Sequence, residues 1–294
     1  MSQFVRVVEA GGFSAVAREQ RSTQGAVSKQ VAALERHLGV RLLNRTTRAL
    51  SLTEEGRHYF DVARRLVQES EELERELRDG KTRISGRLRI GASVAFGRLV
   101  LFDIAKQFMT AHPGIDLDIR LADHFIDLVA DGLDLSVRAG EIQDGSLVAQ
   151  RVGTAPRMLV ASRRYLEARR EPLNHPDDLR AHDCIQYTGM SVDAWSFEGP
   201  AGPVAVKVAG RIRSNSSEMI RQAVLDGMGI GFAPGYLFVR ELAAGDIVPL
   251  LPAYRSQPIP LHVVYPPSRR NSAKVAAFTD AVREGLAACG CHAA

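Results

Sequence analysis

The chain has 294 residues, of which 45% are hydrophobic and 24% charged, and its formal net charge at pH 7 is +4. This composition is typical of globular proteins, and the length predicts two or three domains. The sequence contains no apolar run close to the roughly 18 residues that cross a bilayer, no signal-peptide core, and only three cysteines, too few for a disulfide framework. We therefore expect a cytoplasmic protein with no membrane partner.

Positive charge is concentrated near the amino terminus. Residues 1–53 contain eight Lys or Arg and three Glu, whereas residues 54–79 contain five basic and nine acidic residues. Such a local excess favours a phosphate-bearing partner for the first segment.

Two short helices are predicted at the start of the chain. The apolar stretch "FVRVVEAGG" ends at Gly11 and Gly12, and "FSAVAREQ" follows, with Ser14 placed to cap it. A tight connection over residues 20–22 then leads into a third helix. A helix, a short turn and a second helix with a basic face form a helix-turn-helix, whose second helix enters the major groove of DNA by its amino end.

The third helix, in "STQGAVSKQVAALERHLG", has two different faces. Thr23 is placed to cap its start, and Gly39 to end it in a left-handed conformation. Apolar residues at helical spacing predict the buried face: Val27, Val31, Leu34 and Leu38. The opposite face is small, basic and free of acidic residues: Gly25, Lys29, Ala32, Ala33 and Arg36, with Ser28 on the flank. By itself this pattern leaves a solvated face and a polyanion-binding face equally open.

A hairpin and a long helix are predicted next. Residues 42–45 and 49–52 can pair around a tip that presents Arg45 and Arg48 to a minor groove or to phosphates. Thr53 then caps a helix with a heptad seam, formed by Tyr59, Ala63, Leu66, Ser70, Leu73 and Leu77. This seam packs either on its own domain or on a second copy of the chain.

From residue 87 onward, predicted strands and helices alternate. Strands are expected in "GRLRIGAS", "GIDLDIRLAD" and "LDLSVRAG", and helices at about 98–111 and 125–131. This order predicts an α/β domain with a mostly parallel sheet. A second unit begins near "LVAQRVGTAPRMLVAS", and the strand "IPLHVVYP" and the helix at 272–286 return to the first. Two such lobes would leave a cleft for a small ligand.

Residues 4–56, which include the three helices and the hairpin, resemble the winged helix-turn-helix of LysR-type transcriptional regulators. A looser similarity continues in "HPGIDLDIRL", "DGLDLSVRAG" and "AVLDGMGIGFAPGY". The resemblance implies a DNA-binding head, a linker-helix dimer and two Rossmann-like lobes similar to periplasmic binding proteins. Family members generally carry several more residues before the position of Phe4, so we expect either a misassigned start or a less stable head.

The fold class expected from the resemblance is therefore an α+β multidomain chain that forms homodimers or homotetramers. The expected divisions are a winged helix-turn-helix at 1–56, a dimerisation helix at 53–79, a hinge at 80–86, lobe 1 at 87–157 and 260–294, and lobe 2 at 158–259.

Carried over by position, the resemblance assigns contacts with double-stranded DNA to the start of the third helix and to the hairpin. These residues are Thr23, Gln24, Gly25, Ser28, Lys29, Arg45 and Arg48. Gln pairs with adenine, and Lys donates to guanine or to a phosphate.

The resemblance also assigns six residues to a small-molecule effector site between the lobes: Ser93, Val94, Arg138, Ser214, Asn215 and Pro234. Hydroxyl groups, free N–H groups at helix starts and a cation suit a small organic anion. Helix capping by Ser93 and Ser214, and a structural salt bridge at Arg138, are the alternatives.

Other functions find weaker support. The glycines of "GMGIGFAPG" lack the spacing of a dinucleotide-binding motif, and the sequence has no nucleophile elbow, HExxH or P-loop. Cys289, Cys291 and His292 provide too few donors for a metal site, so we expect no cofactor and no metal. An α/β small-molecule-binding protein or enzyme without DNA function would leave residues 1–80 unexplained. The sequence thus predicts an effector-controlled transcriptional regulator that is not an enzyme, and leaves effector, operator and sign of regulation open.

Overall fold

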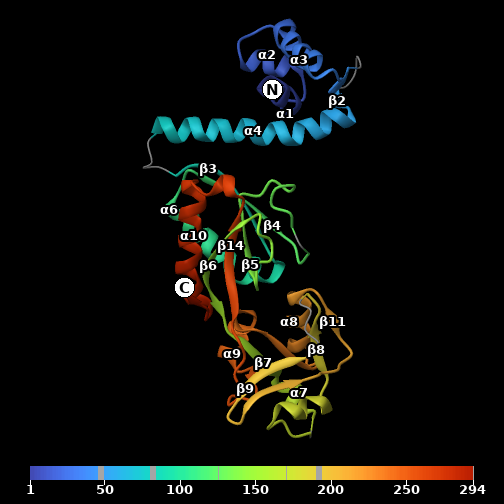
Figure 1. The fold of residues 1–294 in the computed structure, drawn as a ribbon, viewed down its shortest axis with the longest axis vertical. Coiled ribbons are helices and arrows are strands. Elements are labelled where there is room, and N and C mark those ends of the chain that lie inside the picture. The colour runs from blue at the N-terminus through green and yellow to red at the C-terminus, as the bar shows by residue number, and fades with distance from the viewer. Residues whose placement is uncertain (46–49, 80–83, 125, 170, 190–193, 294) are drawn as a thin grey trace. The chain divides into compact units, whose positions relative to one another are not determined.

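The computed structural model describes residues 1–45, 50–79, 84–124, 126–169, 171–189 and 194–293. Two compact units make up the chain, Met1–Arg83 and Ile84–Ala294 (Figure 1).

The first unit contains four helices and one hairpin among its described residues. The helices are α1 (Ser2–Glu9), α2 (Phe13–Glu19), α3 (Gln24–Leu38) and α4 (Glu54–Asp79), and the antiparallel strands are β1 (Leu43–Arg45) and β2 (Leu50–Leu52). Apolar side chains from the helices and the hairpin form one core, which includes Phe4, Val16, Val27, Leu42 and Ala63. The winged helix-turn-helix predicted from the sequence is confirmed.

The boundaries of α3 follow its capping residues. Thr23 Oγ1 accepts a hydrogen bond from Ala26 N at 3.2 Å, and Gly39 has a φ of 71°. The predicted cap at Ser14 is wrong, because the N-cap of α2 is Gly12, two residues earlier, and Ser14 lies inside the helix. Leu38 was expected in the core but is 37% exposed, since the core contacts of α3 end one turn earlier, at Leu34.

Helix α4 starts in close contact with the hairpin. Thr53 Oγ1 accepts a hydrogen bond from Gly56 N at 2.8 Å, and a Cβ on Gly56 would overlap the carbonyl oxygen of Leu42. Of the heptad seam, Tyr59 and Ala63 pack in the core of the first unit, whereas Leu66 is 48% exposed. The side chains of Leu73 and Leu77 lie outside the described part. Of the seam side chains that the structure describes, those of Tyr59 and Ala63 pack on their own domain.

The second unit is built on two main sheets. The first has the strand order β15-β6-β14-β5-β3-β4. Its strands are β3 (Gly86–Ala92), β4 (Ile115–Leu121), β5 (Leu135–Ala139), β6 (Val148–Ala155), β14 (Ile259–Tyr265) and β15 (His292–Ala293). The pairs β3–β4 and β3–β5 are parallel, whereas β14 is antiparallel to both of its neighbours. The three strands from which a mostly parallel sheet was predicted, β3, β4 and β5, are parallel to one another, whereas β14 comes from the far end of the chain and runs in the opposite direction.

Helices cover the first sheet. They are α5 (Val94–Phe96), which continues through the π-helical turn η1 (Gly97–Leu101) into α6 (Phe102–Ala111), and α10 (Ala273–Gly285), which ends in the short η5 (Leu286–Cys289). Helices α6 and α10 pack side by side (Figure 1). The helix expected at 125–131 is wrong: residues 128–131 form turns, because the carboxylate of Asp127 accepts the backbone N–H groups of Val129 and Ala130 at 2.9 and 3.0 Å.

The second sheet has the order β11-β8-β12-β7-β13. Its strands are β7 (Arg157–Ser162), β8 (Cys184–Tyr187), β11 (Arg213–Ser214), β12 (Ile230–Pro234) and β13 (Ile247–Pro249). The remaining elements around it are the hairpin β9 (Trp195–Gly199) and β10 (Gly202–Val206), the helices α7 (Arg163–Glu167), α8 (Ser217–Leu225) and α9 (Val239–Ala244), and the short turns η2 (Pro176–Ala181) and η3 (Gly235–Phe238). The two sheets with their helices are the two predicted α/β lobes.

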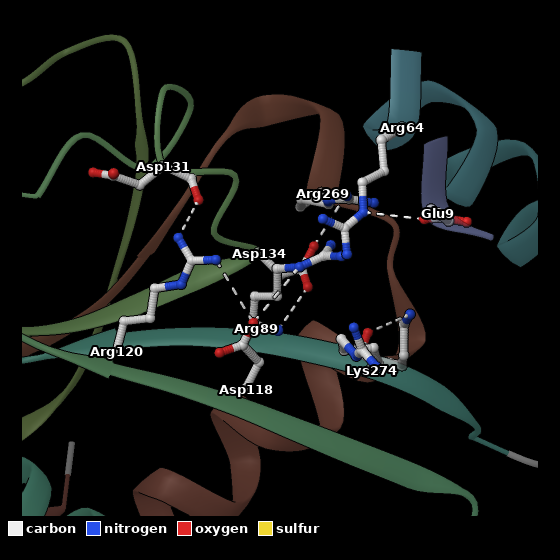
Figure 2. A network of polar contacts seen from close by, with 10 residues as sticks. Glu9, Arg64, Arg89, Asp118, Arg120, Asp131, Asp134, Arg269 and Lys274 are labelled. Carbon is white, nitrogen blue, oxygen red and sulfur yellow. Dashed lines mark hydrogen bonds and ion pairs between the residues drawn. The ribbon is translucent and has the colours of Figure 1, made fainter. Parts of the chain in front are cut away.

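A buried carboxylate joins segments of the first lobe that are distant in sequence. Asp134, 3% exposed, accepts a hydrogen bond from Arg89 N at 2.8 Å, and its other oxygen lies 3.0 Å from Arg269 Nη2 (Figure 2). Lys274 at the start of α10 is also buried and donates to the carbonyl of Arg87 at 3.1 Å. These contacts hold the segment after β14 and the start of α10 against β3.

Candidate functional site

The exposed start of α3 carries the side chains predicted to contact DNA. Thr23, Gln24, Gly25 and Lys29 are exposed, and Ser28 is half-buried. Ser14 Oγ on α2 donates to the amide oxygen of Gln24 at 3.1 Å. Helix α2, packed against α3, therefore orients a side chain of this face.

Gly25 meets no packing requirement from the described residues of its own unit. A Cβ at this position would meet none of their atoms within 4 Å, and the backbone is not in the left-handed region. A glycine inside a helix costs about 1 kcal/mol relative to alanine. A helix that accepts this cost without a packing benefit is suited to a face that another molecule approaches closely.

The hairpin carries the other two residues predicted to contact DNA, Arg45 and Arg48. Strands β1 and β2 pair in register, with Arg45 opposite Leu50. Arg48 lies outside the described residues, as does the side chain of Arg45.

A cavity of about 340 Å³ lies between the two lobes of the second unit. This volume is in the range of small-molecule sites. Its wall is assembled from both sheets. Besides Pro234, the lining includes polar and aromatic residues: Ser93, Asp123, His124, Arg138, Arg157, Tyr187, Trp195, Ser217 and Phe232.

Three of the six residues predicted for the effector site line this cavity: Ser93, Arg138 and Pro234. Ser93 is the N-cap of α5, yet its hydroxyl makes no capping hydrogen bond. Its position in the wall is therefore not explained by helix capping.

The other three predicted residues are not among the lining residues. Val94 N donates to Asp123 Oδ1 at 3.1 Å. Ser214 Oγ accepts from Ser216 N at 3.1 Å, but the N-cap of α8 is Ser216, so Ser214 does not cap this helix, and Asn215 is exposed. The hydroxyl that reaches the cavity from this segment belongs instead to Ser217 at the start of α8.

Two arginines, one from each lobe, bring positive charge to the cavity wall. Arg138 on β5 donates through Nη2 to the carbonyl of Ile126 at 2.7 Å, and burial lowers its pKa while the charges of Asp144 and Asp127 oppose that change. The Arg157 guanidinium at the start of β7 lies 4.9 Å from the centre of the Phe232 ring, and burial lowers its pKa as well. Because a guanidinium stays protonated even when its pKa falls, both are cations at neutral pH.

Aromatic side chains form the wall beside Arg157. The rings of Trp195 and Phe232 lie with their centres 5.3 Å apart, and Phe96 meets Tyr236 edge to face at 5.5 Å. Burial raises the pKa of the Tyr187 phenol, so this side chain is a neutral hydrogen-bonding group. Among the described lining residues, the cavity thus combines aromatic rings with the guanidinium groups of Arg138 and Arg157 and the carboxylate of Asp123.

Sequence reasoning missed Asp123, Arg157 and the aromatic residues of the wall. Arg157 had a detectable signal, because it opens the otherwise apolar strand "RMLVAS". Trp195 and Phe232 had none, because β9 and β12 are joined only by tertiary packing.

Within the described ranges, no group of three or more His, Cys, Asp or Glu is arranged to hold a metal ion. The helices described contain no segment long and apolar enough to span a membrane.

Comparison with known families finds matches over both units. Residues 1–57 match the bacterial regulatory helix-turn-helix protein, lysR family, and residues 81–287 match the LysR substrate binding domain.

Similar characterised proteins cover nearly the whole chain. The transcriptional regulator DmlR of Escherichia coli is 35% identical, over 97% of this chain and 92% of its own length. A transcriptional repressor of Pseudomonas aeruginosa is 34% identical, over 97% of this chain and 90% of its own length. The E. coli transcriptional activator AaeR is 33% identical, over 90% of this chain and 86% of its own length.

Solved structures agree with the fold. CrgA, a LysR-type transcriptional regulator from Neisseria meningitidis, has a TM-score of 0.62 and 31% identity, and the match covers 96% of this chain and 97% of CrgA. The full-length Vibrio cholerae virulence activator AphB has a TM-score of 0.57 and 27% identity, with 96% of each chain covered.

Proposed function

The chain belongs to the LysR family of transcriptional regulators, and from this membership we propose that it binds operator DNA through the start of α3 and responds to a small aromatic carboxylate in the cavity. As a family member, it combines a DNA-binding helix-turn-helix with an effector-binding domain and acts as a regulator rather than an enzyme. The operator contacts, the effector class and the oligomer are the parts that this proposal adds.

The proposed DNA contacts come from the exposed end of α3 and from the hairpin: Thr23, Gln24, Gly25, Ser28, Lys29, Arg45 and Arg48. The excess of basic residues over 1–53 supports a polyanionic partner. The open space above Gly25 supports close approach of a groove. In this arrangement Gln24 and Lys29 contact base edges or phosphates. Arg45 and Arg48 contact the DNA backbone or the minor groove.

The proposed effector follows from one observation, the pairing of two arginines with an aromatic wall. A carboxylate accepts charge-assisted hydrogen bonds from guanidinium groups, here those of Arg138 and Arg157. A flat apolar body would pack on Phe232 and Trp195. Ser93 and Pro234 complete the proposed site.

We propose that the functional unit is a homodimer or a dimer of such dimers. On α4, Val62 is 38% exposed and Leu66 48% exposed, so the helix presents apolar side chains that its own core does not cover. Effector binding would favour one arrangement of the lobes, and the oligomer would convert this preference into a different spacing of the DNA-binding heads.

Calorimetric titration of the full-length protein tests the effector class. Benzoate and benzamide have nearly the same shape but differ in charge, so we expect benzoate to bind at least tenfold more tightly, as one charge-assisted hydrogen bond would provide. Equal affinities, or tighter binding of the cationic benzylamine, would contradict the proposed anion site.

Genome-wide mapping of bound DNA tests the DNA-binding role. We expect a small set of enriched sites that share a sequence with two-fold symmetry, as a dimeric helix-turn-helix requires. Uniform binding without a shared sequence would argue against sequence-specific recognition.

A further inference from the structure

Two cysteine thiols face each other near the carboxyl end of the first lobe. Cys289 ends η5 and Cys291 precedes β15, with Gly290 between them at a φ of 73°. This left-handed conformation, which glycine adopts without strain, turns the chain back on itself. The two Sγ atoms lie 3.2 Å apart, and both thiols are free.

The two thiols differ in access to solvent. Cys291 is 4% exposed and belongs to the apolar core, whereas Cys289 is partly exposed. Cys289 also lines a surface groove together with residues of α6 and α10, such as Phe108 and Ala281. A small reagent in solvent therefore reaches Cys289 first and meets Cys291 directly behind it.

The contact between the thiols also makes them chemically unequal. The hydrogen bond with Cys291 lowers the pKa of Cys289 to about 7, while the same contact and burial raise the pKa of Cys291. In the structure the Cys289 thiol donates to Cys291 Sγ and to the Leu286 carbonyl. Once Cys289 loses its proton near neutral pH, its thiolate is the nucleophile, and the direction of the hydrogen bond with Cys291 reverses. By contrast, burial raises the pKa of the third cysteine, Cys184, to about 12.

We propose that Cys289 and Cys291 form a modification site for hydroperoxides, at which the pair closes to an intramolecular disulfide. The Cys289 thiolate attacks the distal oxygen of the hydroperoxide, the O–O bond breaks, and the alcohol leaves with a proton. Cys289 is then a sulfenic acid. Cys291 loses its proton and attacks the Cys289 sulfur, so that the S–S bond forms, the S–O bond breaks, and hydroxide leaves as water with that proton. Two thiols are oxidised by two electrons and the peroxide is reduced by two.

The geometry requires only a small movement. The two sulfur atoms must approach from 3.2 Å to the bond length of about 2.05 Å. Because the loop that closes contains one residue, the disulfide is expected to be strained and readily reduced by thiols, which makes the modification reversible.

The disulfide would form directly before β15, a strand that packs tightly against β6. β15 pairs antiparallel with β6, His292 opposite Thr154, and a Cβ on Gly153 would overlap the carbonyl oxygen of His292. Since β6 ends two residues before Arg157, the pairing of β15 with β6 connects the cysteine pair to the crossover between the lobes.

Peptide mapping of the full-length protein tests the proposal. The reduced protein is treated with hydrogen peroxide, alkylated without reductant and analysed by mass spectrometry. We expect the mass of the peptide that contains Cys289 and Cys291 to fall by that of two hydrogen atoms, and we expect neither cysteine to be alkylated. Cys184→Ser, the matched control, should behave identically, whereas Cys289→Ser should form no disulfide and Cys291→Ser should stop at a sulfenic acid that dimedone traps.

Three results would overturn the proposal. They are oxidation of Cys289 in the parent protein to a sulfinic acid without a disulfide, a disulfide between two chains, and loss of the reaction in Cys184→Ser. The alkylation rate of Cys289 gives a second measurement: we expect it to rise through pH 7 in the parent and at higher pH in Cys291→Ala, because the pKa of about 7 depends on the neighbouring thiol. If the alkylation rate of Cys289 had the same pH dependence in both proteins, Cys291 would not influence Cys289, and the proposal would be wrong.

Discussion

The face of α3 proposed to contact DNA lies within Thr23–Lys29, whereas the cavity is lined by residues from Ala92 to Leu261. On α3, helical periodicity predicts which side chains point outward, except at Leu38, where the core contacts have ended. In the cavity, the closing of two sheets decides which side chains meet. A substitution on the α3 face is therefore expected to change binding with little effect on folding, while one near the cavity frame affects both. Four predictions test this contrast, in order of decreasing expected effect.

The largest effect is expected at the buried carboxylate of the first lobe. Asp134→Ala removes the partner of Arg269 and the acceptor of Arg89 N, and breaking such a buried pair costs about 3–5 kcal/mol. Denaturant unfolding of the full-length protein measures the loss. The control is Asp131→Ala. Arg120 donates to the backbone carbonyl of Asp131 (Figure 2), so removing the Asp131 carboxylate leaves this contact in place. Equal stabilities of the two variants would mean that this lobe does not depend on the Asp134 contacts.

The next effect concerns the cavity wall. Arg138→Gln and Arg157→Gln each remove one cation, and we expect benzoate affinity to fall by about 1.5–3 kcal/mol, the contribution of a hydrogen bond to a charged group. Calorimetry measures the change. Arg151→Gln, at an exposed position on β6, removes the same charge outside the cavity and should leave the affinity unchanged. Comparable losses in all three variants would indicate a general charge effect rather than a site.

A smaller effect is expected on the α3 face. Lys29→Ala should weaken binding to an operator fragment by about 1 kcal/mol without changing stability. The slope of log K against log salt concentration should become shallower by about 1, because one phosphate contact is lost. Gel-shift titration at several salt concentrations measures both quantities. Gln30→Ala is the control, because Gln30 is the next residue but borders a surface pocket with α1. An unchanged affinity and slope in Lys29→Ala would place the DNA elsewhere.

The smallest effect is expected for Gly25→Ala. This substitution should change stability and DNA affinity in opposite directions. Gly25→Ala should raise the free energy of unfolding by about 0.5–1 kcal/mol, since alanine is the better helix former and meets nothing within 4 Å. The added methyl group should at the same time weaken operator binding. Thermal unfolding and gel shift measure the two parts, and higher stability with unchanged DNA affinity would show that the groove does not approach Gly25.

Local sequence patterns predicted the first unit well. Thr23 and Gly39 marked the bounds of α3, and the positions of Val27 and Val31 identified its buried face. These features were accessible because capping and helical periodicity depend on neighbours within a few residues. The same reasoning failed for Ser14, where a hydroxyl inside α2 binds Gln24 on the next helix instead of the backbone.

The sequence by itself determined the family, the helix-turn-helix, the alternation of strands and helices, and three of the residues that line the cavity. Only the tertiary structure decided that β14 runs antiparallel in the first sheet, that Arg157 and the aromatic rings complete the cavity, and that Cys289 faces Cys291. The physical reason is the range of the interactions. Capping and periodicity act within one or two turns of chain, whereas the wall of the cavity and the two thiols depend on where separate segments come to rest against one core.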